Sequence, residues 1–186
     1  LERMGLGTIR PFETVAAVRE KGAYAGRMAE CSAGKDTITG HWEFMGIVQD
    51  TPFPVYPDGF PDDLMQRFSE KTGYGYLGNK PASGTAIIEE LGMEHLETGK
   101  LIVYTSADSV LQIAASEERI PLEELYRVCR VTRADVTVGE HAVSRVIARP
   151  FIETEDGFKR TENRKDFALE PPRNALDFLK ENGFEV

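Results

Sequence analysis

The sequence predicts an α/β protein in which helices are layered on a sheet. Segments with the spacing of amphipathic helices alternate with short apolar runs rich in β-branched residues, which is the pattern of layered α/β folds. Apolar residues make up 41% of the chain and charged residues 28%, as in an ordinary globular protein. No apolar run approaches the roughly 20 residues that a membrane-spanning helix needs, so we expect no membrane partner.

The first sixty residues are expected to hold a helix, a strand, a loop and a linker. Residues 12–21 have helical spacing and stop before Gly22, which suits a helix C-terminus. Residues 24–29 suit a short strand, and residues 31–42 are small, polar and glycine-containing, as in a functional loop that leads into a helix. Four prolines in residues 51–61 forbid a regular helix and a central strand, so this stretch is the best candidate for a domain boundary.

The remainder of the chain is expected to mix helices and strands. Gly92 suits the end of one helix, and Pro121 suits the first turn of another. Asp156 and Gly157 form a hairpin-type turn, and two prolines at 171 and 172 precede a last amphipathic helix. The expected helices are residues 62–71, 83–91, 109–117, 121–130 and 174–182, and the expected strands are residues 101–105 and 143–148.

The charge balance excludes some partners. The 22 basic and 31 acidic residues give a net charge of −9, which repels nucleic-acid phosphates, so we expect no nucleic-acid partner. An acidic protein still binds a small phosphate if it gathers its cations locally. Cys31 and Cys129 are too few for a disulfide framework, and no signal peptide is recognisable, so we expect a cytoplasmic protein.

Residues 34–43 are the strongest candidate for chemistry. This stretch holds Lys35, Asp36, two threonine hydroxyls and His41 within ten positions. A hydroxyl nucleophile needs a base or a metal to activate it, and Asp36, His41 or a metal ion supplied from elsewhere suits that role. The structural alternative is a capped helix start, with Thr37 or Thr39 as the N-cap and Glu43 near the third position.

Residues 104–109 form a second candidate, because they directly follow the apolar strand expected at residues 101–105. Ligands of open α/β sheets sit beyond the carboxyl ends of strands, and the short hydroxyl of Ser106 and the carboxylate of Asp108 suit hydrogen bonds to sugar hydroxyls. The alternative is that Ser106 or Asp108 caps the next helix.

A third candidate is a group of cations near the end of the expected sheet. Arg145 and Arg149 are an even number of residues apart, so they point to the same face of a strand and can hold a phosphate together. The other cations of the group are Lys159, Arg160, Arg164 and Lys165. The alternative is a solvated face with surface ion pairs.

Two further patterns are set aside. Gly73 to Gly78 matches the dinucleotide fingerprint but follows an expected helix instead of a strand. The histidines and cysteines lack metal-ligand spacing, and we expect His95 and His141 to be surface or packing residues.

Taken together and in this order, these segments resemble the phosphopentomutase family (also called phosphodeoxyribomutase) of the alkaline phosphatase superfamily. The likeness covers essentially the whole chain, and long motifs in a fixed order are more specific than any single short pattern. The matching stretches are residues 34–43, 78–85, 103–115, 145–151 and 160–164.

The resemblance implies a mixed-sheet cap domain inserted in an alkaline-phosphatase-like α/β core, of which only flanking pieces are present. It places the nucleophile loop and part of the core in residues 1–52, the cap in residues 53–169, and the return into the core in residues 170–186. It implies interconversion of α-D-ribose 1-phosphate, or 2-deoxyribose 1-phosphate, and ribose 5-phosphate through a phosphothreonine enzyme. A sugar bisphosphate would serve as activator.

The resemblance also implies roles for individual residues. Thr37 would carry the phosphoryl group and be a metal ligand, with Asp36 as its catalytic neighbour. The residues implied in substrate binding are Ser106, Asp108, Arg145, Arg160 and Arg164.

The departure from the family is in the metal site. The family uses two Mn²⁺ ions, and their other ligands lie outside this sequence, so we expect this chain alone to bind no manganese and to be inactive. Two alternatives remain: a non-catalytic cap module that binds sugar phosphates, and a related metal-dependent phosphatase or phosphomutase. The sequence does not distinguish ribose from deoxyribose.

Overall fold

The computed structural model describes residues 1–10, 12–18, 22–34 and 36–186, which fall into two compact units, Leu1–Cys31 and Ser32–Val186. The first unit holds the short helix α1 (Leu6–Ile9) and an isolated bridge between Phe12 and Val15. The predicted strand at residues 24–29 is not formed, and residues 12–18 of the predicted helix are not helical; residues 19–21 lie outside the described part. Both predictions were wrong because these residues are largely exposed, and short segments rarely hold their structure without packing.

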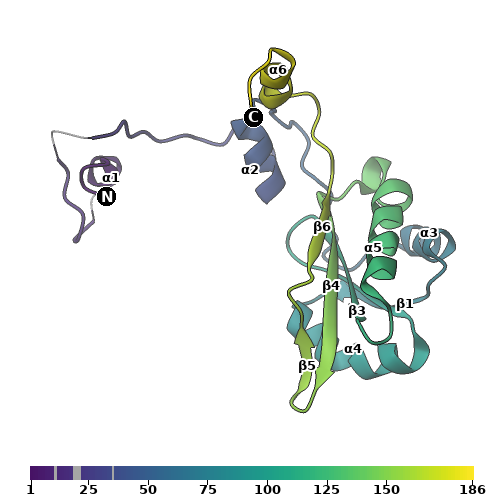
Figure 1. Ribbon diagram of the computed structural model, residues 1–186. Coiled ribbons are helices and arrows are strands. Elements are labelled where there is room, and N and C mark those ends of the chain that lie inside the picture. The colour runs from purple at the N-terminus through teal and green to yellow at the C-terminus, as the bar shows by residue number, and fades with distance from the viewer. Residues whose placement is uncertain (11, 19–21, 35) are drawn as a thin grey trace. The chain divides into compact units, whose positions relative to one another are not determined.

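The second unit is built on a mixed six-stranded sheet (Figure 1). The strands follow the order β1-β2-β3-β4-β5, and β6 also pairs with β4. The pairs β1–β2 and β3–β4 are parallel, and the other pairs are antiparallel. The strands are β1 (Tyr76–Pro81), β2 (Leu101–Thr105), β3 (Val110–Ser116), β4 (Arg145–Thr154), β5 (Gly157–Arg160) and β6 (Lys165–Ala168).

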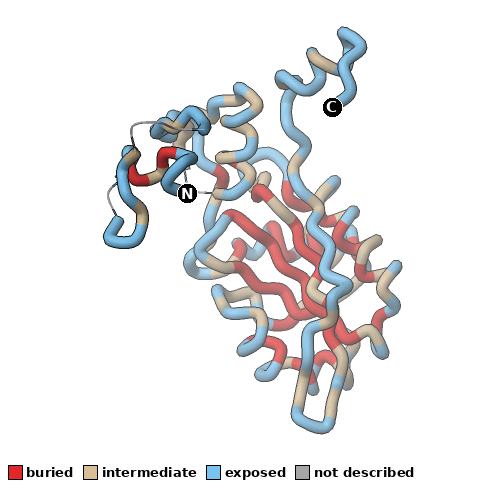
Figure 2. The backbone as a smooth tube through the Cα atoms, turned by 60° about the vertical axis from the view of Figure 1, so that its left-hand side comes forward, coloured by how far each residue is buried: buried red, intermediate tan, exposed pale blue. Residues whose placement is uncertain are grey.

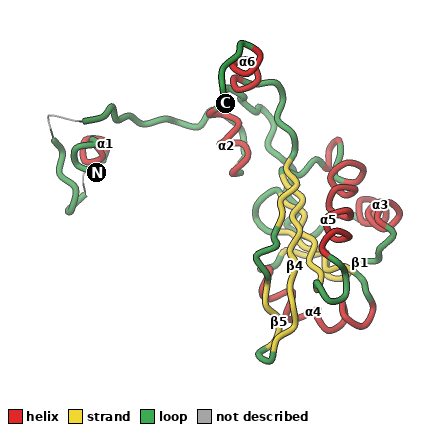
Figure 3. Tube along the Cα trace, in the orientation of Figure 1, coloured by secondary structure: helices red, strands yellow, loops and turns green. Residues whose placement is uncertain are grey.

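Helices cover both faces of this sheet, as the α/β pattern of the sequence predicted. Helices α3 (Asp62–Thr72) and α5 (Leu122–Val131) pack through residues such as Phe68 and Leu125 against one face. Helix α4 (Gly84–Thr98) packs through Ile87 and Ile88 against the other face. Figure 2 shows the resulting core as a run of buried strands, and Figure 3 shows the same strands flanked by helices.

The segment at residues 109–117, predicted as a helix, is the central strand β3. All seven of its residues are buried, because β2 and β4 flank its edges and helices cover both faces. A strand buried on both faces loses the alternation of polar and apolar residues and reads like a buried helix. The fingerprint at residues 73–78 joins the end of α3 to β1, so no strand precedes its first glycine.

Gly92 does not end α4, which continues to Thr98 and is capped by Gly99 in the left-handed conformation. Gly92 is needed for packing: a Cβ there would lie 2.4 Å from the ring of Phe158. The predictions for residues 62–71, 101–105, 121–130 and 174–182 are confirmed, and the strand predicted at residues 143–148 extends to Thr154. Among the described residues, no helix combines the length and the apolar composition that crossing a membrane requires.

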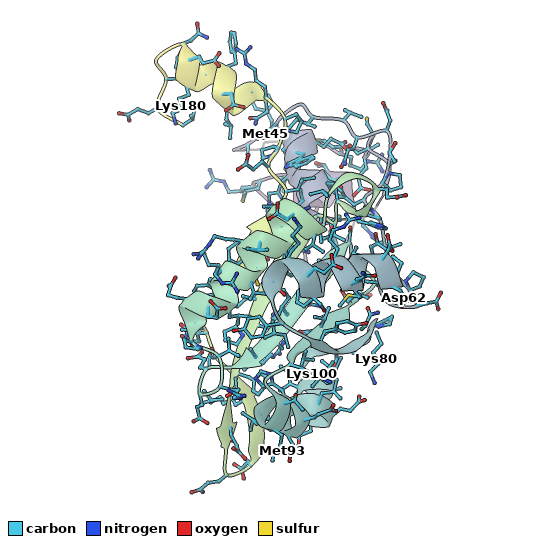
Figure 4. All side chains as sticks on the ribbon, turned by 90° about the vertical axis from the view of Figure 1, so that its right-hand side faces the viewer. Met45, Asp62, Lys80, Met93, Lys100 and Lys180 are labelled. Atoms are coloured by element: carbon cyan, nitrogen blue, oxygen red, sulfur yellow. The ribbon has the colours of Figure 1, made fainter. Side chains whose placement is uncertain are left out.

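Two short helices flank the layered part. They are α2 (Thr37–Phe44) and α6 (Ala175–Glu181), and the latter begins at a capping box on Asn174. The backbone N–H of Ala175 donates to the carbonyl of Met45, 3.3 Å away. Figure 4 labels Met45 and, on α6, Lys180.

His95 is a packing residue, as predicted, and it joins α4 to β3 and to the residue before β2. Its Nδ1–H donates to the carbonyl of Lys100 at 2.7 Å, and its Nε2 accepts from the N–H of Ser116 at 2.9 Å. This pair of bonds requires the neutral imidazole, because a second proton on Nε2 would face the Ser116 N–H. Burial lowers the pKa of His95, the bond to Lys100 raises it, and Arg119 lowers it further.

We therefore expect acid to destabilise the protein through His95. The unfolded chain takes up a proton as the pH falls below about 6.5, whereas the folded chain does so only at its lower pKa, so stability is lost as the pH falls. Urea denaturation should show a loss of up to about 1.4 kcal/mol per pH unit just below that value. His95→Gln should flatten this dependence, and His41→Gln at an exposed position should not. An unchanged slope in His95→Gln would contradict the assignment.

Candidate functional site

Asp36 and Thr37 lie at the start of α2. Asp36 is the N-cap, and its Oδ1 accepts from the N–H of Ile38 at 2.8 Å. Thr37 is exposed as the first helical residue. The predicted helix start is confirmed, but the cap is Asp36 instead of Thr37 or Thr39, and Glu43 lies in the last turn, where its Oε2 accepts from the N–H of Ser32. Lys35 lies outside the described residues.

His41 does not lie against the hydroxyl of Thr37. Its Nδ1–H donates to the backbone carbonyl of Thr37 at 2.7 Å, one turn back along α2. This bond strengthens the first turn of the helix and leaves the Thr37 side chain exposed.

The second carboxylate oxygen of Asp36 ties α2 to the sheet. Oδ2 of Asp36 accepts from the hydroxyl of Ser144 at 2.9 Å, and that hydroxyl lies 2.7 Å from the carbonyl of Ser109. The hydroxyl of Ser109 donates in turn to the carbonyl of Pro54. Both serines are buried, so the chain of bonds is shielded from water. Both oxygens of Asp36 are therefore engaged in holding the loop in place.

Ser106, Asp108 and Arg145 gather at this same end of the sheet. Ser106 and Asp108 belong to the loop from β2 to β3, and no helix follows that loop, so the prediction that they cap one was wrong. Arg145 is the first residue of β4 and pairs with Val110, the first residue of β3. Arg145 directly follows Ser144 in the chain, so the loop after β2 and the start of β4 lie at the end of the sheet to which Asp36 is bound.

Asp166 joins Arg145 to Arg164. Its carboxylate accepts from Nε and Nη2 of Arg164 at 2.8 and 2.7 Å, and it lies 3.4 Å from Nη1 of Arg145. The Nε of Arg145 is buried without a hydrogen-bond partner among the described residues. The sequence analysis missed Asp166, although its place two residues after Arg164 on a short strand is the signal that could have identified it.

Arg149, Arg160 and Arg164 line a pocket farther along the same face. The pocket measures about 480 Å³ and is lined by Thr85, Ile88, Arg149, Pro150, Phe158, Lys159, Arg160, Thr161 and Arg164. Arg160 pairs with Phe151, six residues from Arg145 and so about 20 Å along the strand. The residues predicted to bind substrate thus lie partly at the start of β4 and in the loop after β2 and partly at the pocket, and Asp166 links Arg145 to Arg164 between them.

The predicted pairing of arginines on one face of β4 is confirmed. Arg145 contacts Asp166, and the Nε of Arg149 donates to Gln112 at 3.0 Å. Asp166 and Gln112 both pair with Ile147, which lies between the two arginines on β4. The remaining predicted cation, Lys165, lies over the ring of Tyr126 instead, 5.0 Å from its centre, and is not part of the pocket.

The described residues do not form a metal site. No three histidine, cysteine or carboxylate side chains among them are placed to hold an ion. Thr37 contributes only a hydroxyl, and Asp36 already has both oxygens hydrogen-bonded. The manganese ions implied by the family resemblance stay a prediction that requires ligands from outside this chain.

Comparison with known proteins gives two close relatives. A phosphopentomutase from Carboxydothermus hydrogenoformans is 61% identical over 188 aligned residues, which take in the whole chain and 48% of the relative. A phosphopentomutase from Caldanaerobacter subterraneus subsp. tengcongensis is 58% identical over the whole chain and 47% of its own length. The chain therefore spans about half the length of the curated relatives it matches. No family model matches it.

We expect Asp36 and Ser144 to be energetically coupled. Asp36→Ala and Ser144→Ala should each lower the free energy of unfolding, and the double variant should lose less than the sum by about 1 kcal/mol. Urea denaturation of the four proteins measures this coupling. Asp36→Ala combined with Ser83→Ala, which uncaps α4 instead, should be additive within a few tenths of a kcal/mol. Additive losses for Asp36 and Ser144 would show that their bond does not hold the loop.

Proposed function

Because the chain is homologous to phosphopentomutases along its whole length, we propose that it is the central part of a longer phosphopentomutase. That enzyme would interconvert α-D-ribose 1-phosphate, or 2-deoxyribose 1-phosphate, and the corresponding 5-phosphate. The observation that carries the proposal is the identity of 61% over the entire chain, which includes every residue predicted for the site.

In this proposal Thr37 carries the phosphoryl group. It is exposed at the N-terminus of α2, where backbone N–H groups favour a negatively charged group. The hydroxyl of the sugar phosphate would attack the phosphorus, so that a bond to the sugar forms as the bond to the Thr37 oxygen breaks. Thr37 would then take the other phosphoryl group from the resulting bisphosphate. The proton that the sugar hydroxyl loses in the first step balances the one that Thr37 loses in the second.

The substrate residues have complementary tasks in this proposal. The hydroxyl of Ser106 and the carboxylate of Asp108 would bind sugar hydroxyls, and Arg145, Arg160 and Arg164 would bind phosphate oxygens. A guanidinium group donates two parallel hydrogen bonds to a phosphate, which fixes its orientation as well as its position. Asp36 would act as a positioning residue through its bonds to Ile38 and Ser144.

Exposed apolar side chains support the view that the flanking segments belong to a larger core. Phe44, the last residue of α2, is 66% exposed, and Phe178 on α6 is 59% exposed. Helix α6 has no buried residue at all. All six strands lie within residues 53–169, which supports the proposal that this range is the cap domain and that residues 1–52 and 170–186 belong to the core.

A sugar-phosphate-binding module without catalysis is the second candidate. Two observations favour it. The arginine-lined pocket lies entirely within this chain, whereas the described residues contain no set of three side chains placed to hold a metal ion. Two proteins named phosphopentomutase as relatives favour the enzyme over a related phosphatase.

Thr37→Val in the complete enzyme should abolish the phosphoenzyme. Valine keeps the shape of threonine but lacks the oxygen that carries phosphorus, so radiolabel from a sugar bisphosphate should no longer be retained on the protein. Thr39→Val is the matched control, because Thr39 is two residues along α2 with its hydroxyl on Gln49. Retained label in Thr37→Val would disprove the nucleophile.

The 186-residue chain by itself should not turn over ribose 5-phosphate, because the proposed metal ligands are outside it. A coupled assay of the purified chain in the presence of Mn²⁺ measures this. Turnover at the rate of the complete enzyme would refute the view that the chain is one part of the active site.

A further inference from the structure

The beginning of α4 lies within residues 78–85, a stretch that resembles the phosphopentomutase family but contains none of the residues with a role in the proposed function. Ser83 caps the helix by accepting from the N–H of Ala86 at 3.2 Å, and Gly84 and Thr85 are its first residues. The helix has 15 residues, so its N-terminus carries a substantial positive partial charge.

This helix end opens on the arginine-lined pocket. Thr85 lines the pocket together with Arg149, Lys159, Arg160 and Arg164, and none of its lining residues is acidic. Two of the lining residues are bound to carboxylates outside the pocket: Arg164 donates to Asp166, and Thr161 donates to Glu117. Four cations around one cavity are unusual in a chain with a net charge of −9.

A buried hydroxyl is aimed at the same place. Tyr104 is fully buried, and its hydroxyl has no hydrogen-bond partner among the residues that the structure describes. A Cβ on Gly84 would lie 2.6 Å from this hydroxyl and 3.4 Å from Nη1 of Arg160, so all three groups converge at the helix start. An unpaired buried hydroxyl costs about 1–3 kcal/mol, and phenylalanine would avoid that cost. A bound ligand that accepts a hydrogen bond from this hydroxyl would remove that cost.

Arg164 is paired with Asp166, whereas Arg149 and Arg160 form no ion pair among the described residues. Burial lowers the pKa of Arg149, and Arg164 and Arg160 lower it further, while Tyr104 and Asp166 oppose the shift. Burial raises the pKa of Tyr104 against the effect of the three arginines, so its O–H remains a donor at neutral pH. An anion beside Arg149 and Arg160 would relieve the repulsion and accept hydrogen bonds from their remaining N–H groups.

We propose that this pocket is a second anion subsite, which binds a phosphate monoester through the start of α4, Arg149, Arg160 and Arg164, with the Tyr104 hydroxyl behind it. The cavity of about 480 Å³ is large enough for a sugar phosphate. Four residues of β4, roughly 13 Å, separate Arg149 from Arg145, so this subsite is distinct from the surroundings of Arg145. The subsite rests on the proposed function only for the sugar; the binding of phosphate stands without it.

Titration of the ¹⁵N-labelled 186-residue chain with inorganic phosphate, and then with ribose 5-phosphate, tests the subsite. At constant ionic strength, saturable shifts are expected in the amides of Thr85 and Ala86 and in the Nε of Arg149. Arg149→Gln and Thr85→Val should weaken phosphate binding, the former by about tenfold or more. Arg130→Gln, at an exposed position on α5, should leave it unchanged. Tyr104→Phe should weaken binding while keeping the dispersed spectrum of the folded chain.

The proposal is overturned if these groups do not shift, if chloride shifts them as phosphate does, or if Arg130→Gln weakens binding as much as Arg149→Gln. Thr85→Val removes only an exposed hydroxyl, so it decides the question should Arg149→Gln fail to fold. Unweakened binding in both Thr85→Val and Tyr104→Phe would also overturn it. None of these outcomes depends on phosphoenzyme formation at Thr37, so the subsite and the catalytic proposal fail separately.

Discussion

Pairing of β4 along both of its edges organises the layered part of the protein. One edge pairs with β3 from Arg145 to Phe151, and the other pairs first with β6 and then with β5. A strand held in this way cannot shift its register without breaking hydrogen bonds to three others, so its side chains are fixed to alternate faces. Val146 and Ala148 face the core under α3 and α5, whereas Arg145 and Arg149 face the side that α4 covers.

The same alternation places apolar packing and the arginines that we propose to bind an anion on one face. Phe151 follows Arg149 on this face of β4 and belongs to one apolar cluster with Ile88 of α4, Tyr104 and Phe158. The guanidinium groups therefore stand on a rigid, buried base, and their positions cost little entropy when a ligand binds. The beginning of α4 is brought to these groups by packing, because Ile87 and Ile88 hold its first turns to the sheet.

Much of this architecture could be predicted from the sequence. The spacing in residues 62–71 and 121–130 gives amphipathic helices whose apolar sides are the ones buried, and the even spacing of Arg145 and Arg149 predicted their common face. The strand β3 was mistaken for a helix because residues 110–116 are buried on both faces and carry no visible period. The helix and strand predicted in residues 12–29 rested on local spacing alone, and the described residues 12–18 and 22–29 have too little buried surface to hold them.

The sequence predicted which residues belong to the candidate site better than it predicted how they are arranged in space. Local sequence identified the start of α2, but the contact between Asp36 and Ser144 joins residues 108 positions apart, which no local pattern reveals. The separation of Arg160 from Arg145 depends on where β5 pairs with β4, and this register follows from the hairpin turn before Gly157. Asp166 could not be identified from the sequence, because its position in the site follows from its ion pairs with Arg145 and Arg164.

The hydrogen bond between Ala175 and Met45 has a topological consequence. The end of α2 and the start of α6 are neighbours in space. The residues between them therefore form an insertion whose two ends lie side by side. A short linker from Met45 to Ala175 would bridge those ends and excise the sheet with its three helices as one piece. An insertion of this kind can be gained, lost or exchanged as a unit in evolution, and it can be grafted by design without rethreading the remainder of the protein.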